Sequence, residues 1–384
     1  MELTLSPQKH HKYIDMILSF CKKNIVMIIA LCLAVITSFI VPVDKEYIGY
    51  FDFKTLACLF SVLAVVCALK NINFFYMLAY KIVKVFKTTR MSVLGLVYIT
   101  FIGSMLIAND MALLTFLPLG YIVLSTTKKE KYMVFTFIMQ NIAANLGGML
   151  TPFGNPQNLY LYSKFNIPTG EFVTIMIVPF LIAVLLITLC CLVFVKSESI
   201  EIEGEAIKMP PVRTTIYLVL FALAILIVFN FIPYIIGLII IFISILIMDK
   251  KALKQVDYPL LFTFVFFFIF AGNMSRIDVV RNVFSYLLEK NTLIFSVLSC
   301  QLISNVPSAI LLSQFTNNYK DLLIGVNIGG VGTLISSLAS LITFREYVKH
   351  NPDKTKHYIT VFSLFNFFFL IVLTMSMLFL NMLV

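Results

Sequence analysis

Long apolar runs separated by short polar segments dominate the chain. Because a helix needs about 20 apolar residues to cross the hydrocarbon core of a bilayer, these runs predict membrane-spanning helices. Seven runs are uninterrupted: 24–41, 53–69, 172–195, 213–230, 234–248, 258–272 and 357–381. Two more, 131–160 and 319–344, are interrupted by Gly, Pro and Asn, so we predict that each is a broken helix. The pattern therefore predicts about nine crossings.

Two further apolar stretches, 93–124 and 293–316, have a polar break in the middle. Each arm has about 15 residues, which corresponds to about 22 Å of helix and is too short to cross the membrane. We therefore predict two re-entrant hairpins, each of which enters and leaves by the same face. The predicted fold is an all-α polytopic membrane protein.

Composition and charge agree with a membrane protein. Of the 384 residues, 60% are hydrophobic and only 12% are charged, about half the charged share of a soluble domain. Of the 29 Lys and Arg residues, 22 fall in six segments that face the cytoplasm if the N-terminus is inside: 1–23, 70–92, 125–131, 196–213, 249–257 and 345–357. This bias explains the net charge of +10 without a nucleic-acid partner. We expect a multi-pass protein of the inner (plasma) membrane, with the N-terminus in the cytoplasm and the C-terminus outside.

The two halves of the chain contain the same landmarks in the same order. Asp52 and Asp257 each precede an apolar run, and an amphipathic segment, a hairpin and a broken helix follow in both halves. Basic segments flank only the first hairpin, so we predict that the repeats are inverted in the membrane. The predicted organisation is an N-terminal segment 1–23, a first repeat 24–195, a linker 196–212 and a second repeat 213–384. The acidic residues of the linker predict a solvated connector: Glu198, Glu201, Glu203 and Glu205.

The broken helices supply the first candidate site residues. Residues 145–158 contain three Gly, two Pro and three Asn, and non-helical backbone in a bilayer must be buried in protein or line a wet cavity. Freed carbonyls can coordinate a cation, and a helix N-terminus can bind an anion. The alternative is close helix packing at the Gly pairs. The candidates are Thr151, Asn155 and Thr333 for the substrate, and Asn145, Gly148, Asn327 and Gly330 for the cation.

The hairpin breaks supply the other candidates. The first break contains Asn109 and Asp110, and the second contains Ser304 and Asn305. In the predicted topology Asp110 is the only charged residue at membrane depth, which makes it a candidate for Na⁺ or proton coupling. A compatible alternative is that Asn109 and Asp110 cap the second arm of their hairpin. An anionic substrate would be held by helix N-termini, by Asn109, Ser304 and Asn305, and by a bound cation.

These motifs resemble the ion transporter superfamily, which includes divalent anion/Na⁺ symporters, citrate transporters, arsenite permeases and some Na⁺/H⁺ antiporters. Residues 145–158 are similar to the Gly-Gly-Thr-Gly-Thr-Pro-Pro-Asn-type loop of that family. Asn109 and Asn305 match the Asn of its paired Ser-Asn-Thr hairpin tips. The resemblance implies a substrate site flanked by Na⁺ sites at the tips and unwound helices, an elevator mechanism and a homodimer. The first tip, Ala-Asn-Asp, looks more like the arsenite permease and antiporter branches.

The expected function is secondary active transport of small anions, in particular di- or tricarboxylates, coupled to Na⁺ or H⁺. No cofactor, resident metal or enzymatic activity is expected. One alternative is arsenite efflux or Na⁺/H⁺ exchange through Asp110. A more remote alternative is an intramembrane enzyme, but the chain contains no His-Glu-x-x-His or Gly-x-Ser-x-Gly motif.

Overall fold

The chain folds into helices throughout the part that the structure describes. The computed structural model describes residues 20–21, 24–200 and 209–383, so most of the predicted N-terminal segment and Glu201, Glu203 and Glu205 of the linker lie outside it. Within these residues there is no β-strand, and eight helices are long and apolar enough to cross a membrane. Two shorter apolar helices, α2 (Ile25–Ile40) and α12 (Tyr234–Met248), accompany them. The prediction of an all-α polytopic membrane protein is confirmed.

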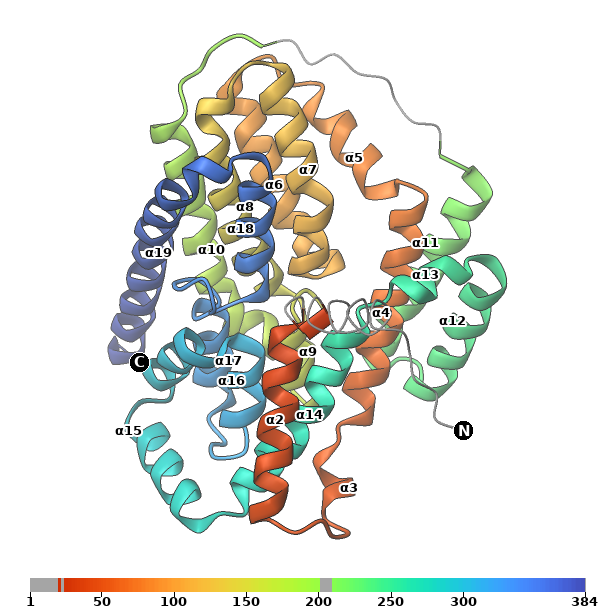
Figure 1. Ribbon diagram of the computed structural model, residues 1–384, viewed down its shortest axis with the longest axis vertical. Coiled ribbons are helices and arrows are strands. Elements are labelled where there is room, and N and C mark those ends of the chain that lie inside the picture. Colours follow the sequence, from red (N-terminus) through yellow and green to blue (C-terminus); the bar gives the residue numbers. More distant parts are fainter. Residues whose placement is uncertain (1–19, 22–23, 201–208, 384) are drawn as a thin grey trace, which may run out of the picture.

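Each uninterrupted apolar run of the sequence forms one helix. Besides α2 and α12, these helices are α4 (Phe53–Asn71), α10 (Thr169–Phe194), α11 (Pro211–Val228), α14 (Tyr258–Ser275) and α19 (Thr355–Leu383). Carboxylates begin two of them, because Asp52 accepts a hydrogen bond from Thr55 N at 2.9 Å and Asp257 accepts one from Leu260 N at 3.0 Å. In Figure 1, α6, α7, α8 and α18 occupy the upper half, whereas α2, α3 and the first part of α15 occupy the lower half.

The two hairpins differ in length. The first consists of α6 (Thr89–Ile107) and α7 (Asn109–Thr126), with 19 and 18 residues. The expectation that its arms are too short to cross was wrong, because the Thr88 hydroxyl accepts a hydrogen bond from Met91 N and starts the helix earlier. The second consists of the end of α15 (Asp278–Ile303), after a kink at Asn291, and the eight-residue α16 (Asn305–Leu312). The re-entrant course of both hairpins stays a prediction.

The two broken helices are interrupted within the predicted segments. The first comprises α8 (Met133–Gly147), the short 3₁₀ helix η2 (Gly148–Leu150) and α9 (Pro156–Lys164). The second comprises α17 (Tyr319–Ile328) and α18 (Leu338–His350), separated by nine residues that include Gly329, Gly330 and Gly332. The remaining helices are short: α3 (Tyr47–Tyr50), α5 (Phe74–Val83) and α13 (Lys250–Gln255).

In the described part of the linker, Lys196, Ser197 and Ser199 are exposed, whereas Glu198 is half-buried and forms ion pairs. Glu198 accepts hydrogen bonds from Lys129 Nζ and, at 2.7 Å, from Lys131 Nζ. These two ammonium groups lower the pKa of the Glu198 carboxyl to about 2. The backbone is fixed as well, since Thr89 N donates to Glu198 O at 2.8 Å. Glu198 therefore ties the end of the first half to both ends of its hairpin.

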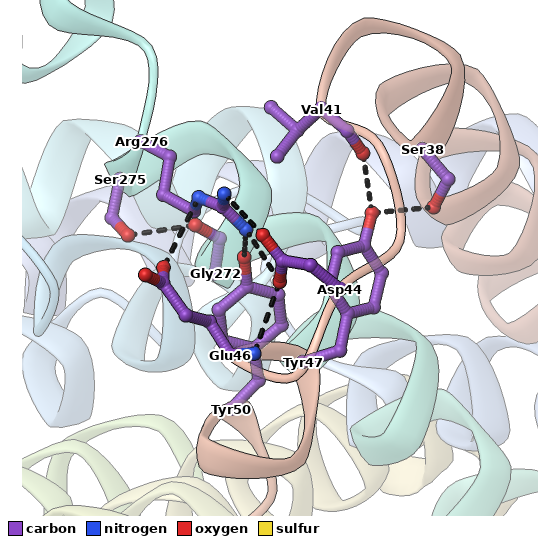
Figure 2. Close-up of polar contacts among 9 residues, drawn as sticks. All are labelled: Ser38, Val41, Asp44, Glu46, Tyr47, Tyr50, Gly272, Ser275 and Arg276. Atoms are coloured by element: carbon purple, nitrogen blue, oxygen red, sulfur yellow. Dashed lines mark hydrogen bonds and ion pairs between the residues drawn. The ribbon is translucent and has the colours of Figure 1, made fainter.

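A polar cluster, drawn in Figure 2, joins the two halves near the α2–α3 loop, which lies at the lower end of the molecule in Figure 1. Arg276, just after α14, donates to Asp44 Oδ2 at 2.6 Å and to the Tyr50 hydroxyl at 3.1 Å, and it pairs with Glu46 at 3.3 Å. The guanidinium holds the pKa of the Asp44 carboxyl below its usual range. Arg276 thus anchors the α2–α3 loop where α15 begins.

Candidate functional site

The two hairpin tips have the same backbone geometry. Ala108 (φ 65°, ψ 151°) and Ser304 (φ 75°, ψ 160°) interrupt the two hairpins in the same unusual conformation. The side-chain oxygens of the next residues, Asn109 and Asn305, accept hydrogen bonds from Asp110 N at 3.0 Å and Val306 N at 2.9 Å. Both Asn side chains are buried. At each tip the helical direction therefore reverses next to an Asn that satisfies an N–H group of the new helix.

Each hairpin tip contacts the broken helix of its own half, and the two broken helices contact each other. Asn145 Oδ1 accepts from Asn109 Nδ2 at 3.3 Å and from the Ser337 hydroxyl at 2.7 Å. Asn305 N donates to Ser336 O at 2.9 Å. A Cβ atom at Gly330 would lie 3.1 Å from Asn305 Nδ2, so a side chain at this position would require the Asn305 amide to shift by a few tenths of an ångström. These contacts bring the predicted candidates Asn109, Asn145, Asn305 and Gly330 together.

Amide side chains also join the two broken helices directly. Asn327 Oδ1 accepts from Asn155 Nδ2 at 3.2 Å and from Gln157 Nε2 at 3.4 Å. Asn327 Nδ2 donates to Asn158 Oδ1 at 2.6 Å, and Asn158 Nδ2 in turn donates to three carbonyls of the first break, those of Gly148, Met149 and Thr151. The predicted candidates Asn155, Asn327 and Gly148 thus belong to one buried hydrogen-bonded network.

The two candidate threonines use their hydroxyls inside the protein. Thr151 Oγ1 donates to Met105 O at 2.7 Å, and Thr333 Oγ1 donates to Gln301 O at 3.2 Å. Each hydroxyl therefore ties a helix break to the hairpin of the same half. Neither threonine lines the cavity described next.

A cavity of about 80 Å³ lies where the two halves meet, which is several times the roughly 10–15 Å³ that one water molecule requires. Four of the predicted candidates line it: Asn109, Asp110, Ser304 and Asn305. All of its lining residues cap, or lie in the first eight residues of, one of six helices, which are α2, α7, α9, α14, α16 and α18. Six helix N-termini therefore converge on one cavity, and each carries partial positive charge.

Six polar residues of this cavity were not among the predicted candidates: Asn24, Gln157, Asp257, Thr263, Ser337 and Arg345. Two other charged residues, Asp257 and Arg345, line this cavity beside Asp110. That Asp110 is the only charged residue at membrane depth stays a prediction. Arg345 is solvent-exposed and forms no ion pair with any carboxylate among the described residues. Arg345 follows Leu338 and Leu341 at helical spacing, so the three residues lie on one face of α18. This spacing is a signal in the sequence that could have identified Arg345.

Two buried acceptor atoms of the cavity residues have no hydrogen-bond partner in the part of the chain that the structure describes. They are Asp110 Oδ1 and Gln157 Oε1. Buried polar atoms are nearly always paired, so such atoms at a cavity indicate a ligand that carries a positive charge or a hydrogen-bond donor. A site of this kind can bind a cation, a proton or a hydroxyl group beside an anion held by helix N-termini.

Known proteins with similar sequences are named as transporters or as a membrane protein. The chain is 36% identical over 297 residues to an uncharacterized transporter of Methanocaldococcus jannaschii, which covers 77% of this chain and 81% of the relative. It is 28% identical over 321 residues to the inner membrane protein YbiR of Escherichia coli, over 80% of this chain and 84% of that protein. A putative transporter, arsB, of Dictyostelium discoideum is 26% identical over 155 residues, 40% of this chain and 27% of its own length. The sequence profile of the citrate transporter family matches residues 14–319. The chain is a multi-pass membrane protein that belongs to the citrate transporter family.

Proposed function

We propose that the chain is a secondary active transporter of small carboxylates, in particular di- or tricarboxylates, coupled to Na⁺ or H⁺. The convergence of six helix N-termini on one cavity carries this proposal, because carboxylates bind favourably to such termini. Arg345 adds a full positive charge and a forked donor that suits carboxylates. The citrate transporter family supports the same substrate class.

Coupling follows from the carboxylate of Asp110 in the cavity. Asp110 would repel an incoming anion as long as it is ionised and no cation is bound to it. A proton or a Na⁺ ion bound at Asp110, whose Oδ1 atom lacks a partner, removes that repulsion. Anion and cation would therefore enter together, which is what a symporter requires.

Transport also requires that the site open to each side in turn. The matched tips and breaks of the two halves support an inverted repeat, the architecture in which one half can adopt the conformation of the other. We propose an elevator-type movement of the hairpins and broken helices against the other helices, in a homodimer. The proposed location is the inner membrane, with the N-terminus in the cytoplasm and the C-terminus outside.

Uptake into proteoliposomes tests this function. Purified protein is reconstituted, and uptake of radiolabelled citrate, malate and succinate is measured under imposed Na⁺ or H⁺ gradients. We expect saturable uptake of at least one of these acids that collapses when the gradient is dissipated. The absence of gradient-driven uptake of every carboxylate would refute the proposal.

A second candidate is arsenite efflux or Na⁺/H⁺ exchange through Asp110. The similarity to the putative transporter arsB and the presence of a carboxylate at the first tip favour it. Expression in arsenite-sensitive or Na⁺-sensitive cells separates it from carboxylate transport. Protection that is lost in Asp110→Asn, without carboxylate uptake, would replace the first proposal by this one.

A further inference from the structure

Gln157 is a buried residue of the cavity lining, and its side-chain oxygen has no hydrogen-bond partner among the described residues. It is the second residue of α9, only 1% of its surface is exposed, and it lines the cavity. Its Oε1 atom is buried and accepts no hydrogen bond from the described residues. A buried amide oxygen in this position is satisfied when a ligand in the cavity donates a hydrogen bond to it.

The hydrogen-bond network determines which end of the Gln157 amide is already paired within the protein. Asn158 Nδ2 donates to three backbone carbonyls, so Asn158 Oδ1 must be the atom that accepts from Asn327 Nδ2, at 2.6 Å. Asn327 Nδ2 also donates to Leu323 O at 2.8 Å, which leaves Asn327 Oδ1 to accept from Gln157 Nε2. The Gln157 donor is therefore used inside the protein, and Oε1 is left as a pure acceptor.

Because Gln157 Oε1 can only accept a hydrogen bond, it limits which chemical group of a ligand can bind there. A carboxylate cannot donate to Gln157 Oε1, whereas a hydroxyl group can. A cation would need several free oxygen ligands, but the neighbouring Asn327 Oδ1 already accepts from two side chains. The second half offers no equivalent group, because Ala339 lies twelve residues after Asn327, as Gln157 lies twelve after Asn145.

We propose that Gln157 Oε1 accepts a hydrogen bond from a hydroxyl group of the transported acid, so that the chain selects hydroxy-carboxylates over carboxylates of equal charge without a hydroxyl. This inference rests on the proposed transport of carboxylates. The carboxylates bind the helix N-termini and Arg345, and the hydroxyl fixes the orientation of the substrate at α9. A site built to bind a hydroxyl discriminates strongly against the analogue that lacks it, since its own polar atom is then left unpaired.

Citrate and tricarballylate provide the test, because they differ by one hydroxyl group. Their apparent affinities are measured by uptake into proteoliposomes for the wild type and for Gln157→Met, which has a similar length but no acceptor. We expect the wild type to prefer citrate by at least about tenfold. In Gln157→Met this preference falls to about twofold or less, while tricarballylate uptake is retained.

Gln140→Met is the matched control. Gln140 is also fully buried with an unpartnered Oε1, but it does not line the cavity. The same change of side chain there should leave the citrate preference as in the wild type. If it abolishes the preference as Gln157→Met does, the effect is one of general packing and the inference is wrong.

The remaining outcomes separate the inference from the proposed function. If the wild type takes up no carboxylate, the proposed function fails. If it takes up both acids equally well, or if Gln157→Met keeps the preference, transport stands and the hydroxyl assignment fails. If Gln157→Met takes up neither acid, Gln157→Asn replaces it, since that variant keeps the amide but withdraws its oxygen by one methylene; an unchanged preference in Gln157→Asn would overturn the assignment.

Discussion

The two helix breaks share a framework but differ in chemistry. In both, an Asn at the end of the first helix donates to the carbonyl four residues earlier, Asn145 to Asn141 O at 3.1 Å and Asn327 to Leu323 O at 2.8 Å. In the first break the loop carbonyls are held by Asn158, from the helix that follows. In the second, the carbonyls of Gly329 and Val331 are held by Gln301, from the adjacent hairpin.

The difference extends to the cavity. The first half contributes a carboxylate, Asp110, and a free acceptor, Gln157 Oε1, whereas the corresponding second-half residues are the apolar Val306 and Ala339. The second half contributes a different set of groups: the carboxylate of Asp257, several hydroxyls and the guanidinium of Arg345. A duplicated backbone framework can therefore carry different polar groups in its two halves, and a cavity with both carboxylates and a guanidinium suits a site that binds a cation together with an anion.

The largest expected effect comes from removing the carboxylate of the first half. Asp110→Asn should reduce gradient-driven uptake by roughly 10- to 100-fold, because interactions of a charged group in a cavity are worth about 1.5–3 kcal/mol. Asp278→Asn, at a carboxylate whose side chain is 85% exposed, is the control and should transport normally. Asp110→Asn combined with Val306→Asp should not restore uptake. Full gradient-driven uptake by Asp110→Asn would remove the distinction between the halves.

Glycine substitutions should show that Gly148 of the first break is more crowded than Gly330, which lies at the same distance along the chain from Asn327 as Gly148 does from Asn145. A Cβ atom at Gly148 would lie 2.4 Å from Asn155 Oδ1 and 2.7 Å from Gly154 O, whereas the closest atom to one at Gly330 is 3.1 Å away. We expect Gly148→Ala to lower the free energy of unfolding by about 1–3 kcal/mol and Gly330→Ala by less than half of that. Thermal unfolding in detergent measures this. Gly170→Ala, with no atom within 4 Å, is the neutral control, and equal losses for the first two variants would contradict the comparison.

The threonine hydroxyls should show a smaller difference in the same direction. Thr151→Val removes a 2.7 Å hydrogen bond to Met105 O and should cost about 1 kcal/mol. Thr333→Val should cost less, because its bond to Gln301 O is longer, at 3.2 Å, and Thr333 N still donates to Gln301 Oε1. Unfolding of both variants is compared with that of Thr174→Val, an exposed threonine of α10. A greater loss in Thr333→Val would reverse the order proposed for the two breaks.

The smallest effect concerns the ends of α4 and α14. At the end of α4, the neutral amide of Asn71 donates a hydrogen bond to Asp249 at 2.9 Å. At the end of α14, the charged guanidinium of Arg276 donates one to Asp44. Because the pKa of Asp44 is lowered in the folded protein, its contribution is complete above the ordinary Asp range and is lost as the pH falls through the lowered pKa. Arg276→Met should therefore be slightly less stable than the wild type at neutral pH and equal to it in strong acid. A difference that persists in strong acid would show that packing, not charge, makes this contact; Arg281→Met, at an exposed pair, is the control.

The sequence by itself determined the helices, the two hairpin tips and the two breaks. Apolar runs of about 20 residues leave a chain few alternatives in a bilayer, and Gly, Pro and Asn mark where helical geometry ends. It also identified Asn109, Asp110, Ser304 and Asn305, which line the cavity. The sequence did not predict the length of the first hairpin arm, because the cap at Thr88 moves the start of that helix without changing the apolar pattern.

Only the tertiary structure decided which polar groups face the cavity. Thr151 and Thr333 were plausible ligands in the sequence, but folding places a backbone carbonyl beside each hydroxyl. Gln157, Asp257 and Arg345 meet at the cavity although 100 and 88 residues separate them along the chain, and no local pattern records that distance. The reason is physical: composition and periodicity fix where a helix runs, whereas the free acceptor of an amide depends on every donor that the folded chain brings to its other end.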